Sequence, residues 1–185
     1  MTEPAEHPPG VHAARWDRAE LQEAHDHYVS VANRAARSGN WEPWAELFTE
    51  DAEYVEHHFG TFRGRHEILR WISTTMAQWP NTEMTMFPHD WCVCDVERGW
   101  WICQIENRFN DPGDGRTYQA PNITILKYAG DMRFSSEEDV YNPASFTPVV
   151  EAWVAAKRAS SSTGESSGPR SPGTGVGGGT GDADD

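Results

Sequence analysis

The chain has 185 residues, and its 15 lysines and arginines against 29 aspartates and glutamates give a formal net charge of -14. That length suits one domain with tails, and the negative charge disfavours nucleic acids and anionic membranes as partners, because both attract basic surfaces. No apolar run approaches the roughly 20 residues of a membrane helix. The N-terminal stretch also lacks the basic start and apolar core of a signal peptide, so we expect a cytoplasmic protein.

Two terminal segments are predicted to be disordered: residues 1–14, rich in Pro, His and Ala, and residues 159–185, rich in Ser, Gly and Pro. Such segments bury too little apolar surface to offset the entropy of ordering them. One domain is expected between them, over residues 15–158. Its predicted elements, in chain order, are a helix over Arg18–Ser38, a short helix around Trp44, strands over Ala52–His58 and 61–63, a helix over Gly64–Trp79, strands over Thr82–Asp95, Gly99–Asn110, Arg116–Tyr128 and Met132–Tyr141, and a helix over Ala144–Ala156.

The first helix is predicted from residues at three- and four-residue spacing that share one face, and Gly39-Asn40 ends it. That face consists of Leu21, His25, Tyr28, Ala32 and Ala35. Long strands with helices gathered on one side predict an α+β fold, in which a curved antiparallel sheet wraps around the N-terminal helices. A curled sheet of this kind leaves an internal cavity. Nine tryptophans fit an aromatic cavity wall, and they also fit an ordinary core or a dimer interface.

The three cysteines do not form a recognisable metal motif. Cys92 and Cys94 lie in one extended run and share a sheet face, and a hairpin could bring Cys103 close to Cys92. A zinc site would need four ligands in recognisable pairs, which are absent. His57 and His58 are adjacent and would point to opposite faces of a strand. We expect reduced core thiols, no metal site and no cofactor.

The stretch from Trp41 to Ile72 resembles the SnoaL-like branch of the NTF2-like superfamily. In that branch a helix, a short helix, a strand, a Gly-x-x-x-Gly-Arg turn and another helix precede a curved antiparallel sheet. Here Gly60 and Gly64 mark the turn. The resemblance extends over roughly residues 19–157. It implies a cone-shaped fold with an internal pocket, and a homodimer formed through the outer face of the sheet.

Limonene-epoxide hydrolases of the same superfamily hold one water between three polar motifs, and the chain resembles them in part. It has Tyr54 and Glu56 where the hydrolases have Tyr-x-Asn, and Gln104 and Glu106 near their Arg-x-Asp motif. Asp139 matches their last aspartate. An arginine and an asparagine of the hydrolases are thus replaced by Gln104 and Glu56.

Ketosteroid isomerases and SnoaL-type polyketide cyclases offer two further comparisons. In the isomerase comparison the base falls on Glu56, but the oxyanion-hole Asp falls on Thr124 and the helical Tyr on Ala32, one turn from Tyr28. The cyclases use a carboxylate on the last strand as the acid/base of an aldol closure, and Asp139 resembles that residue. A carboxyl group in an apolar pocket has a raised pKa, because burial disfavours its charged form.

These comparisons lead to the hypothesis of a small enzyme that performs cofactor-free acid/base chemistry on a hydrophobic, oxygenated small molecule. The reaction would be a cyclisation, an isomerisation, or the hydration of an epoxide or enone. The alternative is a non-catalytic binding or dimerisation module. The expected catalytic residues are Asp139, Glu106 and Glu56, and the expected substrate-binding residues are Tyr54, Asn122, Arg108, Gln104, Tyr28, His25 and Trp71.

Each of these residues also has a structural alternative that the sequence leaves open. Asp139 could belong to a solvated acidic edge, Glu106 could pair with Arg108 on the outer sheet face, and Glu56 could be a charge at the cavity rim. The remaining alternatives are a hydrogen-bonded core role for His25, a packing role for Tyr54 and a buried strand-end contact for Asn122.

Overall fold

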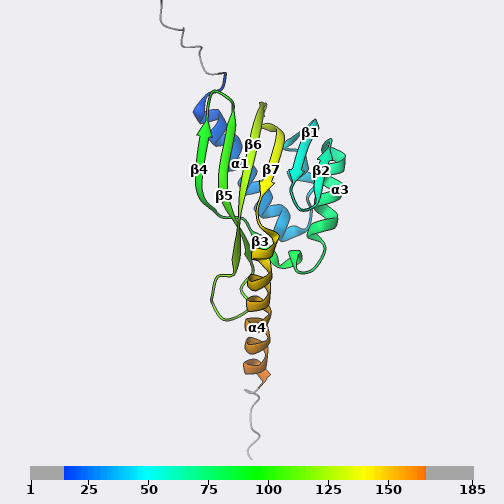
Figure 1. Ribbon diagram of the computed structural model, residues 1–185, viewed down its shortest axis with the longest axis vertical. Helices are drawn as coiled ribbons and strands as arrows, with labels where there is room; N and C mark the ends of the chain where they lie inside the picture. The colour runs from blue at the N-terminus through cyan, green and yellow to red at the C-terminus, as the bar shows by residue number, and fades with distance from the viewer. Residues whose placement is uncertain (1–14, 166–185) are drawn as a thin grey trace, which may run out of the picture.

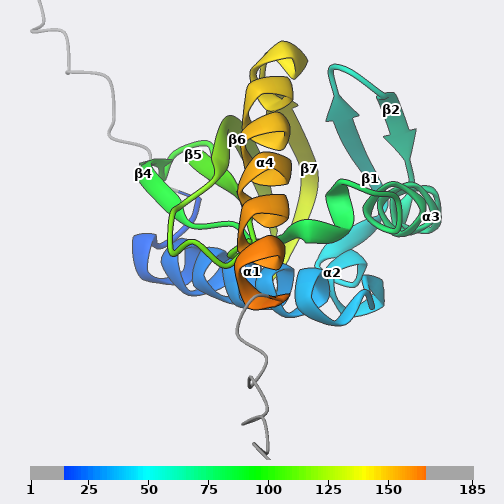
Figure 2. The ribbon, with the colours of Figure 1, turned by 90° about the horizontal axis from the view of Figure 1, so that it is seen from below.

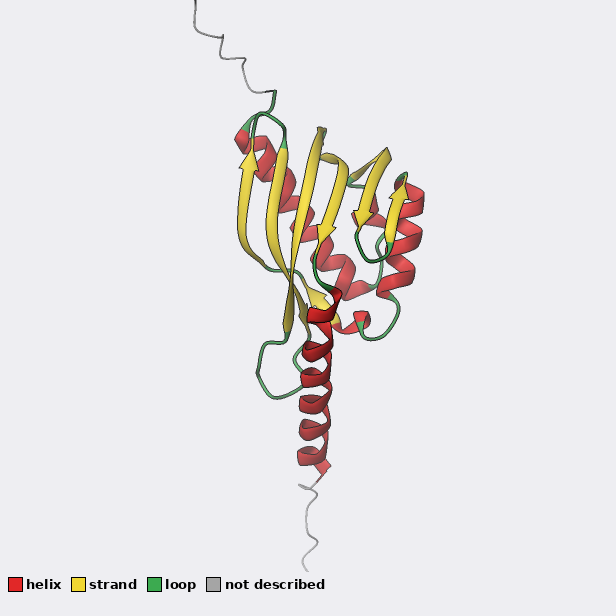
Figure 3. Ribbon diagram, in the orientation of Figure 1, coloured by secondary structure: helices red, strands yellow, loops and turns green. Residues whose placement is uncertain are grey.

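The computed structural model describes residues 15–165, and Figures 1 and 3 show its helices and strands. The helices are α1 (Arg18–Ser38), α2 (Glu42–Ala45), α3 (Arg65–Met76) and α4 (Phe146–Glu165). The strands are β1 (Phe48–Glu56), β2 (Gly60–Arg63), β3 (Met84–Met86), β4 (His89–Asp95), β5 (Trp100–Phe109), β6 (Gln119–Gly130) and β7 (Arg133–Val140).

The seven strands form one curved sheet in the order β2-β1-β7-β6-β5-β3, and β4 also pairs with β5. Neighbouring strands run antiparallel except β1 and β7, which are parallel. The sheet is therefore mixed, whereas the sequence predicted an antiparallel one. A parallel pair needs a long crossover, and here the chain between β1 and β7 supplies it. The predicted α+β cone is otherwise confirmed.

Helix α1 lies across the concave face of the sheet (Figure 2). All five residues of its predicted face are buried. The Asp17 side chain caps its N-terminus by accepting the Ala19 N–H at 2.9 Å, and Gly39, with a φ of 73°, ends it as predicted. The predicted helical face is therefore the surface that packs against the sheet.

Two strand predictions need correction. β1 begins at Phe48, four residues before the predicted start at Ala52, because the chain pairs with Phe134 of β7 from that point. The single strand predicted over Thr82–Asp95 is two strands, β3 and β4, separated at Phe87 and Pro88. Proline has no N–H to donate to a sheet, so a strand interrupts there.

Helix α4 packs at the end of the sheet where β3 and β5 meet, and Figure 1 shows it projecting beyond the strands. Trp153 is buried there with Met84 and Phe109, and its indole N–H donates to the Asn110 carbonyl at 2.8 Å. The helix continues to Glu165, so residues 159–165 are helical and not part of a disordered tail as predicted. The predicted disorder of residues 1–14 and 166–185 lies outside the described residues.

Within residues 15–165, none of the helices combines the length and the apolar content that a membrane-spanning helix needs.

Candidate active site

A cavity of about 270 Å³ lies between the concave face of the sheet and the helices. Its wall is mostly aromatic and aliphatic, which is typical of pockets for small organic molecules. The apolar side chains include Trp41, Trp44, Trp71, Ile72, Met76, Met84, Phe87, Ile105, Phe109 and Phe146. The polar side chains include Tyr28, Tyr54, Glu56, His58, His89, Asn107, Asn122, Glu137, Asp139 and Tyr141.

Asp139 stands on β7 with both carboxylate oxygens hydrogen bonded. The Thr124 hydroxyl donates to Oδ1 at 2.6 Å, and the Tyr54 hydroxyl donates to Oδ2. The side chain is 9% exposed. Burial raises its pKa, and the hydrogen bonds from Thr124, Tyr54 and Asn122 oppose that rise because they stabilise the anion. Asp139 is thus a carboxyl group with a raised pKa whose anionic form is stabilised by hydrogen bonds from the protein.

Glu137 lies two residues earlier on the same strand face, and it is only 2% exposed. Its Oε1 is 2.7 Å from the Tyr28 hydroxyl and 3.1 Å from the Tyr54 hydroxyl, and its Oε2 has no hydrogen-bond partner among the described residues. Burial, and then the charge of Asp139, raise the pKa of Glu137 well above its usual value of 4.5. Two carboxyl groups this close do not both ionise easily. Burial and the charge of Asp139 therefore favour the protonated form of Glu137.

Glu56 ends β1 and lines the cavity. Its Oε2 accepts the backbone N–H groups of His58 and Phe59 at 2.8 and 2.5 Å, while its Oε1 is buried without a hydrogen-bond partner among the described residues. Burial and the contact with Glu56 raise the pKa of Tyr141. One oxygen of Glu56 thus holds the turn that follows β1, and Glu56 also lies close to the Tyr141 hydroxyl.

Most of the predicted site residues line this cavity. They are Asp139, Glu56, Tyr54, Asn122, Tyr28 and Trp71. The cavity therefore brings together side chains from α1, α3, β1, β6 and β7, which are far apart in the sequence. His58 also lines the cavity, while His57 lies outside it, 2.8 Å from Glu138.

Three other predicted site residues do not line this cavity: Glu106, Gln104 and Arg108. Gln104 donates to Glu106 at 2.9 Å and accepts from the Trp91 indole N–H at 3.1 Å, and Arg108 donates to Gln119 at 2.8 Å. These three residues share one face of β5, as predicted, but that face is the outer one. The buried face of β5 is apolar, with Trp101, Cys103, Ile105 and Phe109.

His25, which was expected to contact substrate, also lies outside the cavity lining. The side chain is buried under the sheet, where it is stacked on Trp101 with ring centroids 4.5 Å apart, and it does not line the cavity. Its Nε2 is 3.1 Å from Nδ1 of His89. Burial lowers the pKa of His25 to about 3 and that of His89 to about 4, so both rings are neutral.

Sequence reasoning missed Glu137 as a site residue, although a signal for it was present. Glu137 and Asp139 are separated by one residue of the same strand, so their side chains point to the same face. If Asp139 is predicted to face the cavity, Glu137 is predicted to face it as well. The hydroxyl of Thr124, opposite Asp139 on β6, was likewise assigned no role.

The model of the SnoaL-like domain matches residues 29–134, which is more than half of the chain. The chain belongs to the SnoaL-like domain family. No protein of curated function matches it. The matched range ends before β7 is complete, so Glu137 and Asp139 lie just beyond it.

Several solved structures share the NTF2-like fold of this SnoaL-like protein. A hypothetical protein with a ketosteroid isomerase-like fold from Catenulispora acidiphila, in complex with trimethylamine, is 22% identical with a TM-score of 0.52, over 65% of this chain and 89% of that one. A putative isomerase from Bacillus subtilis is 15% identical with a TM-score of 0.53, over 75% and 94%. A putative SnoaL-like polyketide cyclase from Shewanella denitrificans is 12% identical with a TM-score of 0.53, over 73% and 99%. At these identities the likeness shows the fold alone.

Proposed function

We propose that this SnoaL-like protein is an enzyme that performs cofactor-free acid/base chemistry on an apolar, oxygenated small molecule, with Asp139 as the base. One observation carries the proposal: a buried carboxyl group at the wall of an aromatic cavity accepts hydroxyl hydrogen bonds on both oxygens, beside a second carboxyl group. That environment raises the pKa of Asp139 and still favours its ionised form over that of Glu137. A general base needs both properties.

The proposed first step is removal of a proton from a carbon next to a substrate carbonyl. The C–H bond breaks, the proton moves to a carboxylate oxygen of Asp139, and the electron pair moves to the carbonyl oxygen to give an enolate. Return of the proton to another carbon would complete an isomerisation. In a cyclisation, the enolate carbon would instead form a bond to a second carbonyl carbon, and the alkoxide that results would take the proton back from Asp139. The buried indole N–H of Trp71, unpartnered among the described residues, is the donor that we assign to the substrate oxygen.

Glu137 replaces Glu106 as the partner of Asp139 in this proposal. A protonated Glu137 leaves one negative charge in the pair, on Asp139, because ionising both groups in a buried site costs too much. The outward position of Gln104 and Glu106 also removes two polar groups of the epoxide-opening arrangement, so proton abstraction is preferred to epoxide hydrolysis.

The test is exchange of deuterium from solvent into apolar ketones, such as cyclohexenone and tetralone, followed by NMR. Exchange reports proton abstraction whatever the final product is. We expect the wild-type protein to accelerate exchange and Asp139→Asn to lose the acceleration while its circular dichroism is unchanged. Glu138→Gln is the matched control, because Glu138 is the neighbouring carboxyl group and contacts His57 away from the cavity.

Equal exchange by the wild-type protein and Asp139→Asn would overturn the assignment of the base. Absence of exchange with every ketone, together with tight binding of an unchanged ligand, would favour the alternative of a binding module.

That alternative is supported by a separate observation. Buried acceptor oxygens of Glu56 and Asn122 have no partner among the described residues, and the wall around them is aromatic. Acceptor oxygens with aromatic faces suit an amine cation, and trimethylamine was bound in one structural neighbour. Titration of the protein with trimethylamine by calorimetry tests the idea. A binding module would retain the amine, and Glu56→Gln would weaken binding whereas Glu138→Gln would not.

We also propose that two copies associate through the outer face of the sheet, as the resemblance implies. Val93 and Val140 are exposed on that face, where Ile102, Ile123 and Ile125 are half-buried. Light scattering should give the mass of a dimer, and Ile102→Glu should convert it to a monomer, whereas Glu97→Lys in an exposed turn should not. A monomeric wild-type mass would contradict this assembly.

A further inference from the structure

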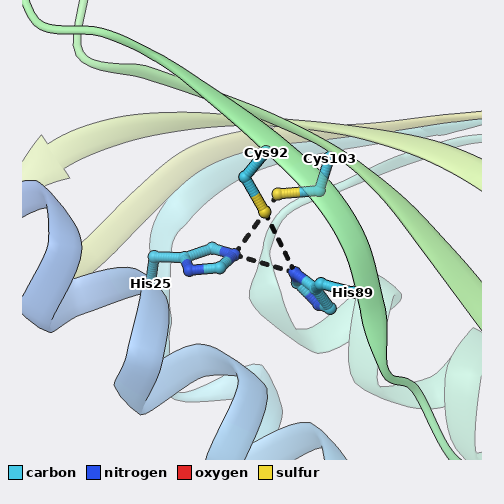
Figure 4. Close-up of side chains that lie close together, drawn as sticks. All are labelled: His25, His89, Cys92 and Cys103. Carbon is cyan, nitrogen blue, oxygen red and sulfur yellow. Dashed lines mark hydrogen bonds between the residues drawn. The ribbon is translucent and has the colours of Figure 1, made fainter.

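Four side chains that no part of the proposed reaction uses converge beside the cavity. His25 comes from α1, His89 and Cys92 come from β4, and Cys103 comes from β5, as Figure 4 shows. One ligand atom from each residue lies within 4.8 Å of all the others. Two imidazole nitrogens and two thiols in one group form a donor set that suits zinc.

The fold gathers these residues by register and by a bulge. Cys92 and Cys103 are direct partners across β4 and β5, so their side chains lie next to each other on one face. His89 is three residues before Cys92, a spacing that turns side chains to opposite faces of a regular strand. The pairing of β4 with β5 shifts register between His89 and Trp91, and such a bulge redirects side chains. His89 therefore faces the same side as Cys92.

The distances between the ligand atoms match a tetrahedral ion. His25 Nε2 lies 3.1 Å from His89 Nδ1 and 3.3 Å from Cys103 Sγ, and His89 Nδ1 lies 3.6 Å from Cys92 Sγ. With Zn–S near 2.3 Å and Zn–N near 2.0 Å, neighbouring ligands in a tetrahedral site are about 3.3–3.8 Å apart. The other three pairs lie within 4.8 Å of each other, so shifts of about 1 Å or less would complete the tetrahedron.

We propose that His25, His89, Cys92 and Cys103 form a Cys₂His₂ site that binds one Zn²⁺ ion. Four protein ligands leave no open position, which is the arrangement of a structural site. The ion would bond to His25 Nε2, His89 Nδ1 and both sulfurs, and each thiol would release its proton to solvent on binding. Cys92 is exposed, which gives the ion a route of entry.

The surroundings of the cluster support a structural role for the ion. The other ring nitrogen of His25 lies 3.7 Å from the Asp26 carboxylate, beyond hydrogen-bond distance. A shift of about 0.5 Å or more would let the carboxylate accept the ring N–H, the contact that commonly orients a zinc-bound histidine. The ion would tie α1 to the β4–β5 hairpin at the wall of the cavity, because His89 also lines the cavity. The site was missed from the sequence because its ligands come from three elements and only Cys92 and His89 are close in the chain.

The first experiment is a metal titration of the full chain, stripped with a chelator and kept reduced. We expect native mass spectrometry to show about one Zn²⁺ per chain, and Co²⁺ to give the visible absorption of a tetrahedral thiolate complex. Cys92→Ser and His25→Gln should lose both signals. The matched controls, Cys94→Ser on the same strand and His27→Gln on the exposed face of α1, should keep them.

Cys92→Ser is the decisive variant, because Cys92 is exposed and its loss should leave the fold intact, which circular dichroism of the metal-free protein checks. The proposal is overturned if the reduced protein binds no stoichiometric Zn²⁺, or if Cys94→Ser loses binding as Cys92→Ser does. It is also overturned if mass spectrometry finds a Cys92–Cys103 disulfide and its reduction creates no Zn²⁺ site. Because binding of the ion is measured without a substrate, these outcomes are independent of the acid/base proposal.

Discussion

Glu137 and Asp139 are two residues apart on β7, and both carboxyl groups contact one hydroxyl group, that of Tyr54. Tyr54 has a single hydrogen to donate, so it can serve only one carboxylate at a time. Burial and the charge of Asp139 favour the protonated form of Glu137, which accepts from Tyr28. Asp139 then receives the hydrogen bonds of Tyr54 and Thr124, which stabilise an anion. This division of roles leads to predictions about pH, stability and activity.

The first prediction concerns the pH dependence of turnover. Burial raises the pKa of Asp139 above its usual 3.8, and a base works only when it is ionised. For any substrate found by deuterium exchange, kcat/KM should fall as the pH falls through that raised pKa, so the midpoint of the acid limb should lie above 3.8. Thr124→Val removes a hydrogen bond to the carboxylate and should move the midpoint upward by about one to two pH units.

The control for that prediction is Thr61→Val, which removes an exposed hydroxyl of β2 and should leave the profile unchanged. If the midpoint of the acid limb is the same in Thr124→Val as in the wild type, the activity does not depend on the ionisation of Asp139, and the prediction is wrong.

The second prediction concerns stability. The pKa of Glu137 is raised in the folded protein above its usual 4.5, so the folded state binds more protons than the unfolded state between these two values. The free energy of unfolding should therefore fall as the pH rises from 4.5 through the raised pKa. Glu137→Gln cannot ionise and should gain stability over the wild type in the same range, on the order of 1–3 kcal/mol at neutral pH.

Urea denaturation of the wild-type protein and Glu137→Gln at a series of pH values measures this difference. Glu138→Gln, at a half-buried position, should change stability by no more than about 0.5 kcal/mol. If the free energies of unfolding of the wild type and Glu137→Gln changed in parallel with pH, the pKa of Glu137 would not be raised by folding, and the prediction would be contradicted.

The third prediction follows from the outward position of Glu106. Glu106→Gln preserves the size of the side chain and an oxygen that can accept from Gln104. The side chain at this position does not line the cavity. Deuterium exchange should stay within about twofold of the wild type, and stability should change by at most about 0.5 kcal/mol. A loss of activity as large as that of Asp139→Asn would return Glu106 to the site.

The sequence was sufficient for the fold because the helix face of α1, the glycine at its end and the strand meander are local signals. The site was predicted where a buried face was clear, as for Tyr54, Asn122 and Asp139. On β5 the predicted residues do not line the cavity. Alternation along the strand places Gln104 and Glu106 on the same face, but it does not show which of the two faces is buried. There the apolar alternate residues, Trp101, Cys103 and Ile105, were the better guide, because they bury more apolar surface.

Contacts between distant segments could not be predicted from spacing. His25 and His89 meet through the packing of α1 on the sheet, and His89 reaches that place only because a bulge alters the register of β4. The parallel pairing of β1 with β7 depends in the same way on the path of the whole chain. These features are set by tertiary packing, for which a single sequence has no local pattern.

The fourth prediction compares two glycines with nearly the same backbone conformation. Gly99 has a φ of +68° and Gly115 a φ of +71°, so alanine is strained at either position, at a cost of about 1–2 kcal/mol. A Cβ at Gly99 would lie 2.5 Å from Nε1 of Trp16, whereas a Cβ at Gly115 would meet nothing within 4 Å. Trp16 packs edge-on against Tyr128, with ring centroids 5.0 Å apart, so it cannot move without losing that contact. Gly99→Ala should therefore lose about 1–3 kcal/mol more than Gly115→Ala by urea denaturation, and equal losses would show that Trp16 gives way freely.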